Sequence, residues 1–314
     1  MQYRKLGETG IDVSVITLGA WVYGVDAWAD VKDHESVQAI HAALDAGINI
    51  IDTAAGYGGG YSERVVGEAV KGRRDEVLLA SKCGAQPERI KQQIDECLQN
   101  MQMDYIDLYQ VHYPSPRIPV PETIGAMAEI QQAGKTRFIG VSNFSLEQHR
   151  EALDTARIET SQPPFNVFWR EIDDDVLPFC REHNIAVLPY SSLAQGLLAG
   201  RFRKREDIPD DIRSKNKLMA DDIFEQCVEV VEHIEEVAAE HGKSVVQAAI
   251  NWTMNVPGIT SPIVGARRSS QVQENIGGVG WKLTDDEMAE ISRRGLEIAK
   301  QLDYSSNMWG YSPK

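Results

Sequence analysis

Short apolar segments recur along the chain about every thirty residues, and segments with helical periodicity separate them. This alternation is typical of βα units, whose strands form a parallel sheet. The apolar segments lie at 15–19, 48–51, 77–81, 107–111, 136–141, 185–190 and 259–264, and a short, polar strand is expected at 158–162. Eight such units without a midway linker predict a (β/α)8 barrel that forms a single domain over residues 1–314.

Five segments fall outside this repeat. Residues 2–15 surround Gly7 and Gly10 and predict a β-hairpin that covers one end of the barrel. Residues 201–217 are charged and predict a long loop or lid, and residues 304–311 predict an irregular substrate loop at the C-terminus. Two extra helices are expected, one over 221–241 and one that opens at Thr284.

Two helix boundaries are expected from local signals. Ser62 precedes the apolar positions Val65 and Val66, so it is the expected N-cap of that helix. Another helix is expected over residues 172–183, before the strand at 185–190.

Three consecutive strands end in titratable residues, which are Asp52, Lys82 and His112. Taken singly, such an aspartate is usually a cap, the lysine a surface charge and the histidine structural. Parallel strands, however, end at the same edge of a sheet, and that edge is where ligands bind. Tyr57 follows Asp52 in a glycine-rich turn. We therefore expect these four side chains to form one site.

The four residue types suit the reduction of a carbonyl group. A tyrosine hydroxyl has a pKa of about 10, and a neighbouring lysine lowers it while an aspartate keeps the lysine charged. Tyr57 can then protonate the developing alkoxide, and His112 can polarise the carbonyl. The hydride must come from a nicotinamide. Because Gly56, Gly58 and Gly60 have the wrong spacing for GxGxxG, the cofactor is expected to bind without a Rossmann domain.

The composition argues against several other kinds of partner and site. The net charge of −15 argues against nucleic acid and against anionic membrane surfaces as partners. No apolar stretch reaches the roughly 18–20 residues of a membrane span and no signal-peptide core is visible, so a cytoplasmic location is expected. The four cysteines include no CxxC pair, so neither a disulfide framework nor a metal site is expected. The sequence gives no indication of oligomeric state.

The ordered motifs resemble those of the aldo-keto reductases over nearly the whole chain. They are Asp52-Thr-Ala, Tyr57-Gly, Ser62-Glu, Lys82, His112-Tyr, Ser142-Asn143-Phe, Gln162, Tyr190-Ser-Ser-Leu and Glu274-Asn275. Their pattern is most similar to the bacterial general-stress and inositol-operon branch. The resemblance implies that Tyr57 is the general acid/base, that Lys82 and Asp52 tune it, that His112 orients the carbonyl, and that NADP(H) binds across the carboxyl face.

The resemblance also implies the residues that bind the cofactor. Ser142, Asn143 and Gln162 would hold the carboxamide, Tyr190 would stack on the nicotinamide, and the backbone of residues 191–196 would contact the pyrophosphate. The further expected contacts are Gly19, Ala20, Trp21, Ser191, Leu193, Gln195, Gly196, Gly265, Arg267, Gln271, Glu274 and Asn275.

One departure from the family concerns the 2'-phosphate. Many members carry Lys-Ser and a later Arg there, whereas this chain has Gly265-Ala-Arg267-Arg268 and Gln271. Either arginine can supply a planar set of donors for a phosphate. The sequence therefore predicts NADPH over NADH.

The substrate is expected to be a small aldehyde or ketone, enclosed by Trp21, Tyr23, Tyr113 and Trp309. Two alternatives remain. The protein can be a non-catalytic NADPH-binding sensor, because some members of the family are channel subunits. Lys82 can instead form a Schiff base, as in an aldolase, but this requires a lowered lysine pKa that Asp52 opposes.

Overall fold

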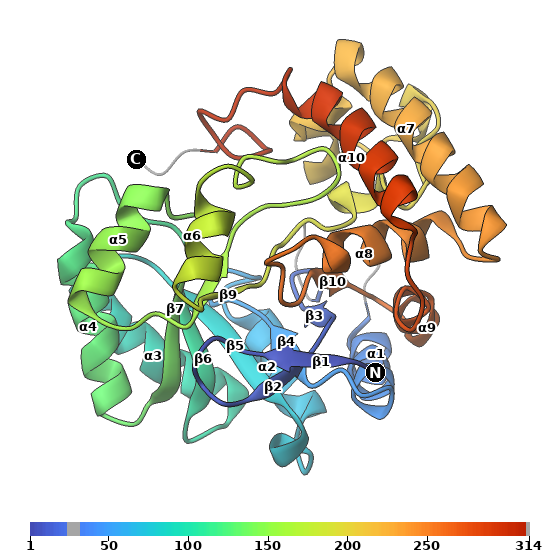
Figure 1. Ribbon diagram of the computed structural model, residues 1–314. Helices are drawn as coiled ribbons and strands as arrows, with labels where there is room; N and C mark the ends of the chain where they lie inside the picture. The colour runs from blue at the N-terminus through green and yellow to red at the C-terminus, as the bar shows by residue number, and fades with distance from the viewer. Residues whose placement is uncertain (24–31, 312–314) are drawn as a thin grey trace.

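The computed structural model describes residues 1–23 and 32–311. Eight parallel strands form one sheet, in the order β10-β3-β4-β5-β6-β7-β8-β9 (Figure 1). They are β3 (Thr17–Gly19), β4 (Ile50–Asp52), β5 (Leu78–Cys83), β6 (Ile106–Val111), β7 (Thr136–Ser142), β8 (Thr160–Gln162), β9 (Ala186–Val187) and β10 (Ile263–Gly265). The amide of Thr260 donates to the Val187 carbonyl at 2.9 Å and that of Ile263 to the Pro189 carbonyl at 2.8 Å. These bonds join the two end strands, which confirms the predicted barrel.

The predicted hairpin closes the amino-terminal end of the barrel. Strands β1 (Tyr3–Lys5) and β2 (Asp12–Ser14) pair antiparallel. Leu6 and Val13 pack in a buried cluster with residues of the barrel strands, such as Ile50, Leu108 and Leu188. The inward positions nearer the carboxyl ends are polar instead, and they include Asp52, Lys82, Gln110, Thr160 and Gln162, all of them buried. The barrel interior is thus apolar near the amino ends of the strands and polar near their carboxyl ends.

Helices surround the barrel. They are α1 (Asp33–Asp45), α2 (Tyr61–Ala69), α3 (Pro87–Met101), α4 (Val120–Gln132), α5 (Leu146–Thr155), α6 (Val176–Glu182), α7 (Asp221–Glu240), α8 (Val245–Asn255), α9 (Ser269–Ile276) and α10 (Asp285–Ala299). The two extra helices α7 and α10 pack against each other, side by side in Figure 1. No helix in the described ranges is long and apolar enough to span a bilayer.

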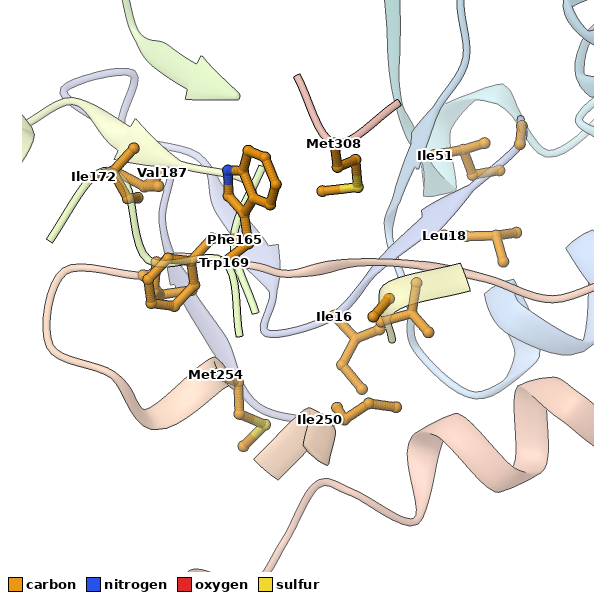
Figure 2. Close-up of a cluster of buried hydrophobic side chains, with 14 of the residues drawn as sticks. Ile16, Leu18, Ile51, Phe165, Trp169, Ile172, Val187, Ile250, Met254 and Met308 are labelled. Atoms are coloured by element: carbon orange, nitrogen blue, oxygen red, sulfur yellow. The ribbon is translucent and has the colours of Figure 1, made fainter. Parts of the chain in front are cut away.

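Buried apolar side chains outside the barrel interior pack the C-terminal segment against the rest of the protein. Figure 2 shows Met308 in one buried cluster with Trp169, Ile16 and Ile250. The Met308 side chain is fully buried, and it directly precedes Trp309 in the sequence. The tail is therefore anchored next to Trp309, one of the residues expected to enclose the substrate. All four cysteines are likewise buried, and none of them forms a disulfide.

Two expected helix boundaries are wrong. Helix α2 begins at Tyr61, and Gly60 occupies its N-cap with a φ of 83°, a left-handed conformation that suits glycine. Ser62 instead donates its hydroxyl to the Ala20 carbonyl at 2.7 Å. Helix α6 begins at Val176 rather than at 172, and the Asp175 carboxylate accepts from the Val176 amide. The 201–217 segment contains the short 3-10 helices η3 (Arg205–Asp207), η4 (Ile212–Lys215) and the start of η5 (Lys217–Met219).

Candidate active site

A buried ion pair lies at the carboxyl ends of β4 and β5. The Lys82 ammonium donates to Asp52 Oδ2 at 2.6 Å, to the Thr53 carbonyl at 2.9 Å and to the Tyr57 hydroxyl at 3.3 Å. The side chains of Lys82 and Asp52 are 0% and 4% exposed. An ammonium has three N–H donors, so each has a partner within the chain. The structure thus brings three of the expected catalytic residues into one chain of contacts.

The other oxygen of Asp52 accepts from two amides in the barrel interior. Gln162 Nε2 donates to Asp52 Oδ1 at 2.8 Å, and Gln110 Nε2 approaches the same oxygen at 3.4 Å. Thr160 donates to Gln110 Oε1 at 3.0 Å. A Cβ at Gly140 would lie only 1.9 Å from Thr160 Oγ1, so glycine makes room for this bond. Both carboxylate oxygens are therefore held in place.

Burial and charge act in opposite directions on this group. Burial alone would lower the pKa of Lys82, but attraction to Asp52 and Tyr57 outweighs it and raises the pKa. Burial raises the pKa of Tyr57, and Lys82 opposes this only in part. Lys82 by itself lowers the pKa of Tyr57, as expected. The net pKa is nevertheless raised, so the expected net lowering is wrong. A lysine held as ammonium cannot attack a carbonyl, which disfavours the aldolase alternative.

His112 is the fourth expected catalytic residue. Its ring lies edge-on to that of Tyr57, with the centroids 5.7 Å apart. Burial, with a smaller contribution from the charge of Lys82, lowers the pKa of His112 to about 3. The ring is therefore neutral at physiological pH and can donate a hydrogen bond to a carbonyl oxygen.

A cavity of about 500 Å³ opens above these residues. Most of the expected cofactor and substrate residues line it. They are Gly19, Trp21, Ser142, Gln162, Tyr190, Ser191, Leu193, Gln195, Gly196, Gly265, Arg267, Gln271, Tyr113 and Trp309, together with Asp52, Tyr57 and His112.

Several expected residues support the cavity without lining it. Ala20 is buried, and its carbonyl accepts from the Ser62 hydroxyl. Asn143 Nδ2 donates to the His112 carbonyl at 2.9 Å, and its Oδ1 accepts from the Tyr190 hydroxyl at 2.8 Å. These two contacts fix the positions of residues that do face the cavity. In the same way, Asn275 Nδ2 donates to the carbonyl of Gly265, which lines the cavity, at 3.3 Å.

Two residues that were expected to contact the substrate or the cofactor lie away from the cavity. Tyr23 is fully buried, and its hydroxyl donates to the Ala266 carbonyl at 2.8 Å, so it is not a wall of the substrate cavity. The carboxylate of Glu274 accepts from the Ser244 hydroxyl and thereby links α9 to the start of α8. Both side chains turn toward the protein because polar partners are available there.

Three arginines form a basic part of the cavity wall, and they are Arg201, Arg213 and Arg267. Burial lowers the pKa of Arg267, and the charges of Arg213 and Arg201 lower it further. Arg268 points elsewhere, since its side chain is 65% exposed and pairs with Glu35 at 3.2 Å. Arg267 is therefore the better placed of the two expected arginines. Arg201 and Arg213 were not expected from the sequence, although the basic segment at 201–217 in an acidic chain was a signal.

The backbone of the loop over 191–196 is strained at three positions. Ser191, Ala194 and Gln195 have φ values of 61°, 45° and 53°, in a region that residues other than glycine rarely adopt. Such strain persists where surrounding contacts hold it, and turns of this kind present amide groups to anions. Together with the arginines, this loop fits a dinucleotide phosphate.

The C-terminal tail completes the aromatic wall. Trp309 packs edge-on against Trp21, with centroids 5.4 Å apart, and lies nearly parallel to Tyr190. Asn307, which was not expected at the site from the sequence, donates to the Tyr113 hydroxyl at 3.1 Å. Within the described ranges, no group of three or more His, Cys, Asp or Glu is arranged to hold a metal.

Comparison with known proteins agrees with this geometry. The model of the aldo/keto reductase family matches residues 15–294. The aldo-keto reductase YhdN of Bacillus subtilis is 38% identical over 307 residues, which cover 93% of each chain. The NADH-specific methylglyoxal reductase of Escherichia coli is 30% identical and is matched over 94% of this chain and 100% of its own.

Solved structures show the same architecture. A glycerol dehydrogenase from Gluconobacter oxydans superimposes with a TM-score of 0.88 at 33% identity, over 96% of this chain and 98% of its own. An aldo/keto reductase from Klebsiella pneumoniae, solved with NADP and acetate, gives a TM-score of 0.77 at 29% identity, over 96% and 98%.

Proposed function

The chain belongs to the aldo/keto reductase family, and we propose that it reduces small aldehydes and ketones to alcohols with NADPH, using Tyr57 as the proton donor. The observation that carries this proposal is the buried chain of contacts from Asp52 through Lys82 to Tyr57, which ends at the cavity. A nicotinamide cofactor supplies the hydride when bound.

Each catalytic side chain has a separate task. The Tyr57 hydroxyl gives its proton to the oxygen of the reduced carbonyl, and the Lys82 ammonium stabilises the phenolate that remains. Asp52 keeps Lys82 charged and oriented. The neutral ring of His112 donates a hydrogen bond that orients and polarises the substrate carbonyl.

The preference for NADPH rests on the basic wall. Arg267, Arg213 and Arg201 gather around the cavity in a chain whose net charge is −15. Arg213 also pairs with Asp211, but three arginines on one wall still concentrate positive charge where a 2'-phosphate can bind. One relative uses NADH, so the family relationship alone does not decide this point. A kcat/KM for NADH equal to or above that for NADPH would contradict the proposal.

The test of the proposed function is NADPH oxidation with 4-nitrobenzaldehyde or methylglyoxal by the wild type and by Tyr57→Phe. Removal of the proton donor is expected to lower kcat by roughly a thousandfold, within the usual range for general acid catalysis. The Kd for NADPH should stay within about twofold. Tyr61→Phe is a matched control, because the Tyr61 hydroxyl contacts Asp33 at the surface.

The other outcomes are equally informative. Equal activity of wild type and Tyr57→Phe would show that Tyr57 is not the acid. Tight NADPH binding without turnover of any carbonyl by the wild type would favour the non-catalytic sensor.

A further inference from the structure

A second cavity, of about 400 Å³, opens beside the catalytic residues. It lies above the ends of β5 and β6. Its lining residues are Ala55, Lys82, Cys83, Gly84, Ala85, Gln86, Arg89, Gln93, Pro114 and Ser115, and it shares Gly56, His112, Tyr113 and Tyr311 with the first cavity. The two cavities therefore adjoin at the histidine that faces the substrate carbonyl.

Aromatic rings stand between the two cavities. Tyr113 stacks on His112, with centroids 5.2 Å apart and an interplanar angle of 24°. Tyr311 packs edge-on against Tyr113, also at 5.2 Å. Beside them, a Cβ built at Gly56 meets no atom within 4 Å, so the backbone faces open space there. A substrate with its carbonyl at His112 can extend past these rings into the second cavity.

The second cavity has the charge of an anion site. Its described lining residues include Lys82 and Arg89 but no aspartate or glutamate. Gln86, Gln93 and Ser115 add neutral polar groups. The chain as a whole carries a net charge of −15, so a cavity whose described lining has no carboxylate contrasts with the acidic average of the molecule.

Of the two cations, Arg89 is the one that can bind a ligand. The three N–H donors of Lys82 already bond to Asp52, Thr53 and Tyr57. Arg89 donates from Nη1 to Gln92 at 3.3 Å and has four other N–H groups. A guanidinium presents paired donors that match the two oxygens of a carboxylate.

We propose that the second cavity binds a carboxylate of the substrate through Arg89, so that the preferred substrates are aldehydes or ketones carrying a carboxylate a few bonds from the carbonyl. This inference rests on the proposed carbonyl reduction and narrows its substrate class. A single guanidinium matches the single charge of a carboxylate better than the double charge of a phosphate.

The test compares succinic semialdehyde with butanal, two aliphatic aldehydes of equal chain length that differ in the terminal carboxylate. The wild type is expected to have the higher kcat/KM for succinic semialdehyde. Arg89→Gln should raise the KM for this acid roughly tenfold or more, as expected for the loss of a charged hydrogen bond. Its kcat for the acid and both constants for butanal should stay within about twofold.

Lys91→Gln is the matched control. It removes the same charge from the same helix, but Lys91 pairs with Glu129 at the surface and does not line the cavity. This variant should leave the constants for both aldehydes within about twofold.

Several results would overturn the inference. They are a wild type that prefers butanal, an Arg89→Gln variant with unchanged KM values, and an equal rise in KM for both aldehydes. If neither is reduced while 4-nitrobenzaldehyde is, the inference fails and the proposed function stands. If no carbonyl compound is reduced, both fail.

Discussion

Two groups of cations lie at the active site, and their surroundings differ. Lys82 is fully buried and has three partners from the chain itself. Arg201, Arg213 and Arg267 line the wall together, and their mutual repulsion contributes to the lowered pKa of Arg267. The inner cation is held by partners of the chain before any ligand arrives. In the outer group Arg213 pairs with Asp211, and three arginines gather on one wall where an anion can bind. The first arrangement suits proton transfer and the second suits binding.

The largest expected effect comes from breaking the inner arrangement. Lys82→Met leaves the Asp52 carboxylate buried without its cation, which typically costs about 3–5 kcal/mol of unfolding free energy. Urea denaturation measures this loss. Lys5→Met is the control, because Lys5 pairs with Asp12 at the surface, where the two side chains are 62% and 57% exposed and such pairs contribute below about 1 kcal/mol. Equal destabilisation by the two substitutions would contradict the comparison.

A smaller effect is expected from the outer group. Arg267→Gln removes a charged donor for the 2'-phosphate, so the Kd for NADPH should rise roughly tenfold to a hundredfold. The Kd for NADH should change little, as fluorescence titration can show. Arg268→Gln serves as the control, because Arg268 pairs with Glu35 away from the cavity. An equal loss of affinity for both cofactors would mean that Arg267 does not contact the 2'-phosphate.

The smallest expected effect concerns pH. Reduction requires protonated Tyr57, whose pKa is raised, so activity should be lost only as pH rises above the ordinary tyrosine value of about 10. His112 has a pKa of about 3 and stays neutral. The kcat for reduction should therefore be flat between about pH 5 and pH 9. An inflection near pH 6.5 that His112→Asn abolishes would show that the histidine titrates.

The sequence was sufficient for the barrel and for the contact between Asp52, Tyr57 and Lys82. Strand ends repeat at regular intervals, and parallel strands place those ends together whatever the details of packing. Gln110 was within reach of the same reasoning, because it lies two residues before His112 and alternate residues of a strand share a face.

Other features depend on contacts that the sequence does not encode locally. Trp21 and Tyr23 are two residues apart in one turn, yet Trp21 lines the cavity while Tyr23 reaches the Ala266 carbonyl, more than 240 residues away in sequence. Arg213, in the 3-10 helix η4, and Arg267, after β10, approach each other from segments far apart in the sequence. Such pairings follow from the tertiary structure alone.

The burial of every cysteine has a consequence for the chemical durability of the protein. Aldehydes are electrophiles that modify thiolates and neutral amines. Burial raises the pKa of all four thiols, to about 12 for Cys180, so the reactive thiolate is scarce at neutral pH. Among the described residues that line the two cavities, Lys82 is the one lysine, and Asp52 holds it as an ammonium. In a protein built in this way, the thiols and the catalytic lysine are poorly reactive toward the aldehydes that it reduces, because hemithioacetal formation needs a thiolate and imine formation needs a neutral amine.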